Sequence, residues 1–425
     1  MVDQQGSEVK NGCRAVALAC ALPWNVVSAS DSLQRLGDFL QYALPATGLA
    51  ATALHRDSDG TVQWLWSGAT TLAFVGVGKA LGDKTRPDET SDTSFPSGHA
   101  AWAFWGASFL DSRYGPGWGI PAYALAALTA YSRVEADKHY PDDVIAGASI
   151  ALLSNFFWVR PLARDVTVEP LLMKGGATGF AVRLFDAPVR SLEHNRRALG
   201  ATPWRFSYQV ANTGTRRNIV ASPAATGSRV DVGQLTSPAD PTLNSSIVLS
   251  RVDGANEVSL QVAPFGTGAV SPLSAPSTFD GAKFDAAPTD VDYRRYDYRI
   301  RYRRAFSPGE SVTLRLGASA QAVRTAIELS QPVVRASVSV WSVLPLLHAT
   351  VEWRLARDWQ IALSGDGMAL GSSRFAEAGL QVQYRFSDGW NASLGIGDRR
   401  STVDKSALYN DLRQRAPYLA VEHRW

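Results

Sequence analysis

The sequence predicts two structural parts, an N-terminal helical bundle followed by an antiparallel β-barrel of about 12 strands. Apolar residues recur every three or four positions up to about residue 160, which is the period of an amphipathic helix. After Arg160 and Pro161 they alternate at every second position, which is the period of a strand. The length of 425 residues leaves room for two or three domains. We expect a signal peptide at 1–29, the helical part at 31–163 and the barrel at 170–425.

Composition excludes several classes of protein. Hydrophobic residues make up 45% of the chain, so it can bury a core and is not a disordered protein. The formal net charge of +3 is too small to indicate a nucleic-acid partner. Both cysteines, Cys13 and Cys20, lie near the start. If the N-terminus is cleaved, disulfides and thiolate metal sites are excluded for the mature chain.

The first 29 residues have the three parts of a secretory signal peptide. Lys10 and Arg14 supply positive charge, the segment 15–24 is almost wholly apolar, and Val27-Ser28-Ala29 offers a small-x-small cleavage site. Asp3 and Glu8 are unusual in such a segment, and the alternative is a disordered tail or an uncleaved amphipathic helix. A cleaved signal peptide predicts export of the mature chain.

Five segments carry the helical period: 33–44, 62–82, 99–112, 119–132 and 144–158. Clusters of Gly, Pro, Asp and Ser separate them. A membrane-spanning helix needs about 20 predominantly apolar residues, and the apolar runs here are shorter or are interrupted by polar residues. We therefore expect a compact bundle that is soluble or rests on a membrane surface; a marginal integral-membrane bundle is the alternative.

Three short motifs within 65 residues concentrate charged and polar side chains. They are Lys79-x6-Arg86-Pro87, then Pro96-Ser97-Gly98-His99, then Ser132-Arg133-x5-His139-x3-Asp143. Ser97 falls where a loop enters a helix, and the free N–H groups of a helix N-terminus bind anions. Arginine and lysine complement phosphate oxygens, while a histidine backed by a carboxylate is an activated nucleophile. Together the motifs predict a site that holds a tetrahedral oxyanion and attacks it.

Each of these residues also has an ordinary structural explanation. Ser97 alone could be a helix cap, Arg133 could compensate the dipole at a helix C-terminus, and Asp143 could be an N-cap. Pro141 keeps Tyr140 out of the helix, which places the preceding histidine on the incoming loop. Because all three motifs occur together, a shared site explains these residues better than a separate structural role for each.

The motifs and their spacing resemble the signature of the type 2 phosphatidic acid phosphatase family, over about residues 33 to 160. The resemblance implies that His139 attacks phosphorus to form a phosphohistidine, that Asp143 orients His139, and that His99 protonates the leaving oxygen with a pKa near its unperturbed value. The resemblance further implies a set of groups that hold the charge on the phosphate oxygens: Lys79, Arg86, Ser97, Gly98 and Arg133.

The family resemblance also implies a substrate class. We expect a phosphate or pyrophosphate monoester, either a phosphorylated lipid of the lipid A, polyprenyl or phosphatidyl type or a small phosphate ester, with no cofactor and no metal. Vanadium haloperoxidases share the three motifs, because vanadate is shaped like the pentacoordinate phosphoryl transition state. Their reaction is therefore the less favoured alternative.

The second half of the chain alternates apolar and polar residues. In 296–303 even positions are aromatic or aliphatic and odd positions are charged, and similar alternation recurs at 312–316, 359–364 and 380–386. Short turns alternate with long polar stretches, and the chain ends on the aromatic Trp425, as bacterial outer-membrane barrels do. We expect arginines of the odd face to line a polar lumen. The alternative is a soluble β-sandwich or partner-binding module.

These features combine into one hypothesis. The barrel would anchor the chain in the outer membrane of a Gram-negative cell, with the phosphatase part in the periplasm. The rival hypothesis is an outer-membrane channel or assembly protein whose helical part is a catalytically idle plug.

Overall fold

The computed structural model describes residues 29–82, 84–162, 165–172, 178–185, 204–235, 242–370 and 373–425. The predicted signal peptide, including Cys13 and Cys20, lies outside the described residues except for Ala29, which begins the first helix.

The predicted helical segments fall within helices, except that Gly82 lies just past the end of its helix. Five helices come first in the chain: α1 Ala29–Leu54, α2 Ser58–Leu81, α3 Gly98–Tyr114, α4 Pro116–Glu135 and α5 Pro141–Trp158. Their ends follow from local chemistry. Asp57 caps α2 by accepting a hydrogen bond from the backbone N–H of Gly60 at 2.9 Å. Gly115, with a φ of +87°, ends α3, and Pro116 opens α4. Within the described residues, none of the helices is both long enough and apolar enough to cross a membrane.

Small residues let these helices approach one another closely. A Cβ atom added to Gly106 of α3 would lie 2.4 Å from the backbone of Leu44 in α1. A Cβ atom on Gly147 of α5 would lie 2.2 Å from the carbonyl oxygen of Ser97. One core cluster joins α1, α3 and α4: Leu44, Ala51, Ala103, Ala107, Leu110, Ala122 and Ala126. The close approach of α5 to the start of α3 matters for the site described below.

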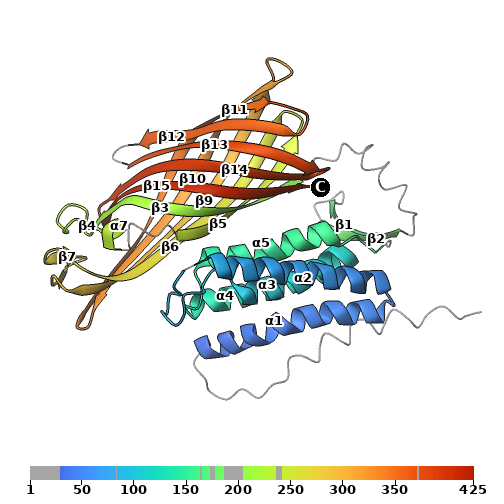
Figure 1. The fold of residues 1–425 in the computed structure, drawn as a ribbon, viewed down its shortest axis with the longest axis horizontal. Helices are drawn as coiled ribbons and strands as arrows, with labels where there is room; N and C mark the ends of the chain where they lie inside the picture. Colours follow the sequence, from blue (N-terminus) through green and yellow to red (C-terminus); the bar gives the residue numbers. More distant parts are fainter. Residues whose placement is uncertain are drawn as a thin grey trace, which may run out of the picture.

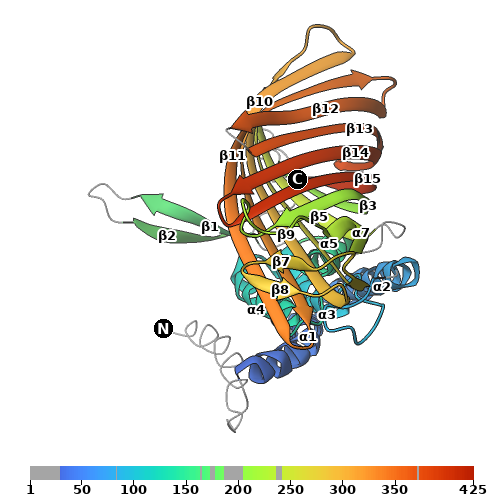
Figure 2. The ribbon, with the colours of Figure 1, turned by 90° about the vertical axis from the view of Figure 1, so that its left-hand side faces the viewer.

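The C-terminal part is a closed antiparallel barrel. Its strands are β3 Trp204–Ala221, β5 Thr242–Asp253, β6 Asn256–Pro272, β9 Pro288–Phe306, β10 Val312–Gln331, β11 Val334–Arg354, β12 Trp359–Leu370, β13 Ser373–Ser387, β14 Trp390–Lys405 and β15 Leu408–Arg424. The last strand pairs with the first, with Val421 opposite Tyr208, and this pairing closes the cylinder (Figure 2).

The predicted strand count of about 12 is wrong, because ten strands close the barrel. The prediction assumed about 10 residues per strand, whereas β10 has 20 residues and β11 has 21. Other short strands lie outside the cylinder. One separate hairpin consists of β1 Asp165–Leu172 and β2 Thr178–Phe185, and another of β7 Ser277–Phe279 and β8 Ala282–Phe284. The two-residue strand β4 Val230–Asp231 pairs only with β3.

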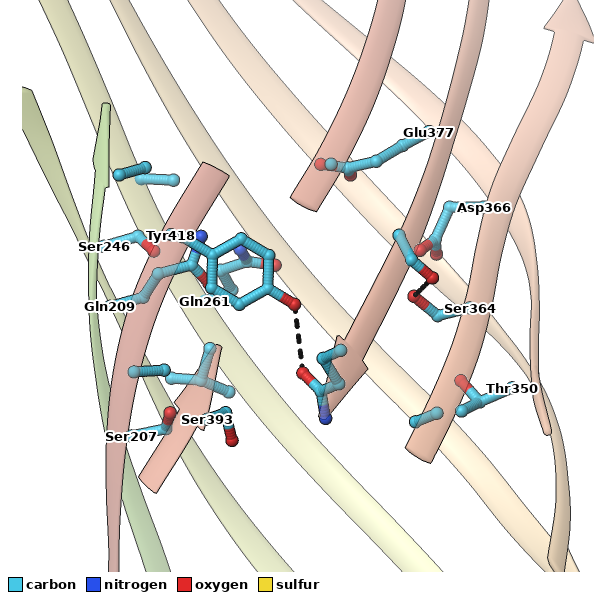
Figure 3. A pocket seen from close by; sticks show the side chains of 18 of the residues that line it. Ser207, Gln209, Ser246, Gln261, Thr350, Ser364, Asp366, Glu377, Ser393 and Tyr418 are labelled. Atoms are coloured by element: carbon cyan, nitrogen blue, oxygen red, sulfur yellow. Dashed lines mark hydrogen bonds between the residues drawn. The ribbon is translucent and has the colours of Figure 1, made fainter. Parts of the chain in front are cut away.

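The barrel is polar inside and apolar outside. Arg299, Arg301 and Arg303 line a cavity of about 330 Å³ in the lumen, which confirms the prediction for these arginines. Figure 3 shows other polar side chains that line this cavity, among them Glu377 and Tyr418. Ion pairs cross this lumen, among them Arg299 with Glu377 at 2.9 Å. Large apolar side chains on the same strands are exposed on the outer wall, for example Ile300, Val343, Leu347, Leu363 and Leu394. Alternation of this kind is typical of a barrel that crosses a membrane.

The helices lie alongside the outer wall of the barrel (Figure 1). The helix α5 packs along β5 and β6. Near its C-terminal end, Phe156 contacts the rings of Phe206 and Trp425. Near its N-terminal end, Tyr140 lies against Gly266 of β6, where an added Cβ atom would come within 2.6 Å of the tyrosine ring. The two parts of the chain are thus held in contact along the length of α5.

Candidate active site

The start of α3 provides backbone N–H groups at the bottom of the candidate site. Ser97 is the N-cap and accepts a long hydrogen bond of 3.5 Å from the N–H of Ala100. Gly98 is the first helical residue, and His99 follows it in the first turn. The backbone N–H of Ser97 donates to the carbonyl oxygen of Asp143 at 2.9 Å, which ties the start of α3 to the start of α5. A helix N-terminus built in this way favours a bound anion.

His139 and Asp143 lie on the loop and first turn of α5, as predicted. Oδ2 of Asp143 lies 3.7 Å from Nδ1 of His139, which is an ion-pair contact longer than a hydrogen bond. The same oxygen accepts hydrogen bonds from the Ser94 hydroxyl at 2.6 Å and from the backbone N–H of Tyr140 at 2.9 Å. The histidine side chain is 3% exposed. Because Asp143 faces Nδ1, the other ring nitrogen, Nε2, is the one available to a ligand.

Burial lowers the pKa of His139. Asp143 opposes this effect and raises the pKa, while the positive charges of Arg86 and Lys79 lower it further. The net pKa lies below the usual value. The neutral, nucleophilic form of the imidazole therefore dominates at neutral pH and persists into mildly acidic solution.

Lys84 is a central residue that the sequence motifs do not contain. Its Nζ donates to Oδ2 of Asp142 at 2.6 Å and to Oδ1 of Asp143 at 2.8 Å, and all three side chains are buried. Burial alone would raise the pKa of Asp143, but the positive charge of Lys84, the nearby His139 and the hydrogen bonds from Lys84 and Ser94 bring it below the usual value. The lysine thus keeps Asp143 ionised beside His139. The signal in the sequence was the adjacent Asp142-Asp143 pair, which needs a cation when it is buried.

Asp38 of α1 is a second residue that the motifs missed. Its Oδ1 lies 3.0 Å from Nε2 of His99 and 2.7 Å from an amino group of Arg133, so it bridges two predicted site residues. Arg133 is further held by the carbonyl oxygen of Gln34 at 2.6 Å. Gly37 allows this approach, because a Cβ atom there would lie 2.8 Å from the Arg133 guanidinium. One acidic residue in an amphipathic helix gives no distinctive signal in a single sequence.

The pKa of His99 is lowered to about 4, so the expectation that it stays near its unperturbed value is wrong. Burial is the largest cause, and the positive charge of Arg133 adds to it, whereas Asp38 raises the pKa. His139 also lowers the pKa of His99, which means that the two imidazoles interact.

Lys79 and Arg86 complete the cluster of cations. Lys79 lies in the last turn of α2 and donates to the carbonyl oxygen of Thr93 at 2.9 Å. Burial and the neighbouring Arg86 lower the pKa of Lys79, while Asp143 raises it. The Nε of Arg86 is buried and has no hydrogen-bond partner among the described residues. A buried guanidinium donor without a partner fits a site for an anionic ligand.

The structure therefore brings the predicted residues together at one end of the helices. His139 interacts with Arg86, Lys79 and His99, and His99 interacts with Arg133. Ser97 and Gly98 lie beside Asp143 through the Ser97 backbone bond. Among the described residues, no group of three or more His, Cys, Asp or Glu side chains is arranged to hold a metal ion.

Comparison with known proteins gives matches for both parts of the chain. Residues 60–164 match the PAP2 superfamily. A lipid A 1-phosphatase of Porphyromonas gingivalis is 35% identical over 100 residues, which cover 22% of this chain and 22% of that protein. A lipid A 4'-phosphatase of Helicobacter pylori is 43% identical over 133 residues, which cover 28% of this chain and 65% of that protein. The chain thus spans less than two thirds of the length of either relative.

Two solved structures are also similar to parts of the chain. The outer membrane protease OmpT of Escherichia coli aligns over 52% of this chain and 97% of its own, with 8% identity and a TM-score of 0.31. LpxE of Aquifex aeolicus aligns over 30% of this chain and 90% of its own, with 19% identity and a TM-score of 0.24.

The family match covers the three motifs and the helices α2 to α5 that carry them. It begins after α1, so Asp38 lies outside the matched residues. The chain therefore carries a PAP2 superfamily domain at residues 60–164, joined to a closed ten-stranded β-barrel.

Proposed function

We propose that the protein is a lipid phosphatase that works through a phosphohistidine on His139 and needs no metal. The observation that carries the proposal is the placement of His139 against Asp143 and within the field of Arg86 and Lys79. The two relatives are named as lipid A phosphatases, which supports a phosphorylated lipid as the substrate. The substrate phosphate would lie on the α3 N-terminus, between these cations.

The first chemical step forms the phosphoenzyme. The Nε2 lone pair of His139 attacks phosphorus, the bond from phosphorus to the ester oxygen breaks, and His99 gives its proton to the departing oxygen. Lys79, Arg86 and Arg133 stabilise the charge on the three equatorial oxygens. Positioning and electrostatics of this kind supply most of the catalysis in phosphoryl transfer.

The second step releases inorganic phosphate. His99, now neutral, takes a proton from water as the water oxygen attacks phosphorus, and the bond from phosphorus to Nε2 breaks. Asp143 stabilises the positive charge that His139 carries in the phosphorylated state. His99 ends the cycle protonated and His139 neutral.

The low pKa of His99 bears on the first step. At a pKa of about 4 the ring is neutral in the free site at neutral pH. A bound phosphate brings negative charge to the site, which offsets Arg133 and raises the pKa of His99. The proton needed for the leaving oxygen would therefore be taken up together with the substrate.

The barrel supports an anchor in an outer membrane. Its exterior is apolar and its lumen is crossed by ion pairs. The rival hypothesis of a plug is not favoured, because the helices lie against the outer wall and not in the lumen (Figure 1).

The side on which the site opens is a separate proposal. The sequence suggested the periplasm. However, Tyr140 lies against Gly266, ten residues along β6 from the short turn at Asn256, or about 25 Å along the barrel axis for a tilted strand. Both long connections between barrel strands, 222–241 and 273–287, lie at the other end, and long loops are extracellular in bacterial outer-membrane barrels, whose apolar band is about 25 Å tall. This geometry favours a site at the opposite, outer rim, and we propose that location in place of the periplasm.

The experiment that tests the function is phosphate release by purified full-length protein from a panel of phosphorylated lipids and soluble phosphate esters. We expect release from at least one phosphorylated lipid, and a loss of at least about 10³-fold in His139→Ala. The control is His55→Gln, which changes an exposed histidine near the C-terminal end of α1 and should leave the rate unchanged. Equal rates for wild type and His139→Ala would defeat the proposal.

A further inference from the structure

A groove runs between the helices and the barrel, next to the candidate site. It encloses about 1310 Å³. On the helical side it is lined by Arg86 and Tyr140, and on the barrel side by Tyr296, Arg324 and Trp341. The barrel therefore contributes one wall of a cavity whose other wall belongs to the PAP2 domain.

The groove reaches the candidate catalytic residues. Arg86 lines it and also lowers the pKa of His139 by its charge. Tyr140 lines it and follows His139 directly in the chain. The wall is fixed in place, since Asp137 accepts a hydrogen bond from Arg294 of β9 at 3.0 Å. A molecule whose phosphate lies at Arg86 would extend along this groove.

The barrel wall of the groove presents a row of side chains suited to an amphipathic molecule. Tyr296 of β9, Arg324 of β10 and Trp341 of β11 occupy directly opposed positions on the three strands. Trp341 is 56% exposed and stacks on Tyr298 with ring centroids 6.1 Å apart. Exposed aromatic rings on the outer wall of a membrane barrel typically meet the boundary between acyl chains and head groups.

Arg324 gives this aromatic wall a polar anchor. Its Nε donates to the Ser339 hydroxyl at 3.0 Å, and its guanidinium lies 5.8 Å from the centre of the Tyr296 ring. No ion pair holds Arg324 among the described residues, whereas Arg294 beside it is paired with both Asp137 and Asp292. Arg324 can therefore donate to an ester or phosphate oxygen of a ligand.

The charges in the groove restrict what it can bind. Carboxylates also line it, namely Glu89, Glu135, Asp137, Asp290, Asp292 and Glu328. They outnumber the arginines, so the groove is unsuited to a polyanion. An aromatic wall with one free arginine fits instead the acyl-bearing portion of a lipid that carries its phosphate at one end.

We infer that the outer wall of β9, β10 and β11 is the lipid-binding half of the active site, with Tyr298 and Trp341 contacting the acyl-bearing part and Arg324 its ester oxygens. The inference rests on the proposed function and adds where the lipid part of the substrate binds. The substrate would enter sideways from the membrane leaflet, with its tail on the barrel and its phosphate at His139.

The test compares two substrates of one enzyme. Full-length Tyr298→Ala/Trp341→Ala and Arg324→Gln variants would be assayed for kcat/KM on a phosphorylated lipid in mixed micelles and on p-nitrophenyl phosphate. We expect kcat/KM for the lipid to fall roughly tenfold or more in both variants, because the first loses two apolar contacts and the second loses a charged donor. For the small ester we expect kcat/KM to change less than twofold.

A matched control removes an equivalent aromatic pair from another part of the outer wall. The ring centroids of Trp359 and Tyr384 lie 4.7 Å apart, the two side chains are 46% and 40% exposed, and neither lines the groove. The Trp359→Ala/Tyr384→Ala variant should match wild type on both substrates, and heat-modifiable gel migration should show that all the variants are folded.

Three results would overturn the inference. They are wild-type activity of the groove variants on the lipid, equal losses on both substrates, and equal losses in the groove variants and the control pair. A wild-type protein that releases phosphate from neither substrate would instead defeat the proposed function itself.

Discussion

At the scale of single residues, two histidines of one site have different environments. His139 is almost fully buried and has Asp143 on one side of its ring. His99 is partly exposed and shares Asp38 with Arg133. Both pKa values are lowered by burial, and each ring has its own carboxylate that opposes the effect. Pairs of this kind allow one ring to act as nucleophile and the other as acid and base.

In the proposed mechanism, Asp38 acts on the reaction through His99, as a positioning residue. Asp38→Asn keeps an oxygen for Arg133 but removes the charge that raises the pKa of His99, so less of the acid form is available. General acid catalysis contributes about 10² to 10⁴-fold. We expect kcat to fall about 100-fold for an alkyl phosphate and less than tenfold for p-nitrophenyl phosphate, whose leaving group needs no proton.

The control for this prediction is Asp31→Asn, an exposed acidic residue in the first turn of the same helix. It should leave kcat unchanged for both esters. If Asp38→Asn lowers kcat equally for the alkyl and the p-nitrophenyl ester, the role assigned to Asp38 is wrong.

The site residues that could be predicted from the sequence are those that belong to one of the three motifs. His139, Asp143 and the Ser97-Gly98-His99 turn stand at fixed spacing, and the fold brings them together. Lys84 and Asp38 have no such spacing. They reach the site because the loop before α3 folds over Asp143 and because α1 packs on α4 at Gly37. Such long-range contacts leave no periodic signal in one sequence.

At the scale of elements, the spacing of apolar residues predicted whether a segment is helix or strand better than it predicted the number of strands. The five helical segments were identified because apolar residues recur at helical spacing in each and clusters of turn-forming residues separate them. The barrel count was too high because strands of 20 residues extend beyond the membrane band, and their polar ends resemble turns in the sequence. Gly266 and Gly268 of β6 were also unremarkable in the sequence, although the structure places Tyr140 against them.

At the scale of the whole molecule, the helices and the barrel form one unit with two different ends. The end that holds the β5–β6 turn and Trp425 also gathers Phe156 and Trp390. The other end holds the candidate site and the groove. If the barrel crosses an outer membrane, these two ends face opposite sides of it.

The orientation can be tested with cysteines on intact cells. In a chain with Cys13→Ser and Cys20→Ser, we expect Thr90→Cys, on the exposed loop beside Arg86, to react with a maleimide too large to pass through porins. Asp388→Cys, in the short turn between β13 and β14, is the matched control and should react only after the outer membrane is permeabilised. The reverse pattern would return the site to the periplasm.

The central claim is that His139 carries the phosphoryl group. The most direct measurement is to trap it in His99→Ala with ³²P-labelled p-nitrophenyl phosphate, whose leaving group departs without an acid while hydrolysis of the intermediate lacks its base. After a quench in alkali, we expect the label on Nε2 of His139 and none in the variant that also carries His139→Ala. A label on any other residue, or turnover that continues undiminished in His139→Ala, would contradict the account.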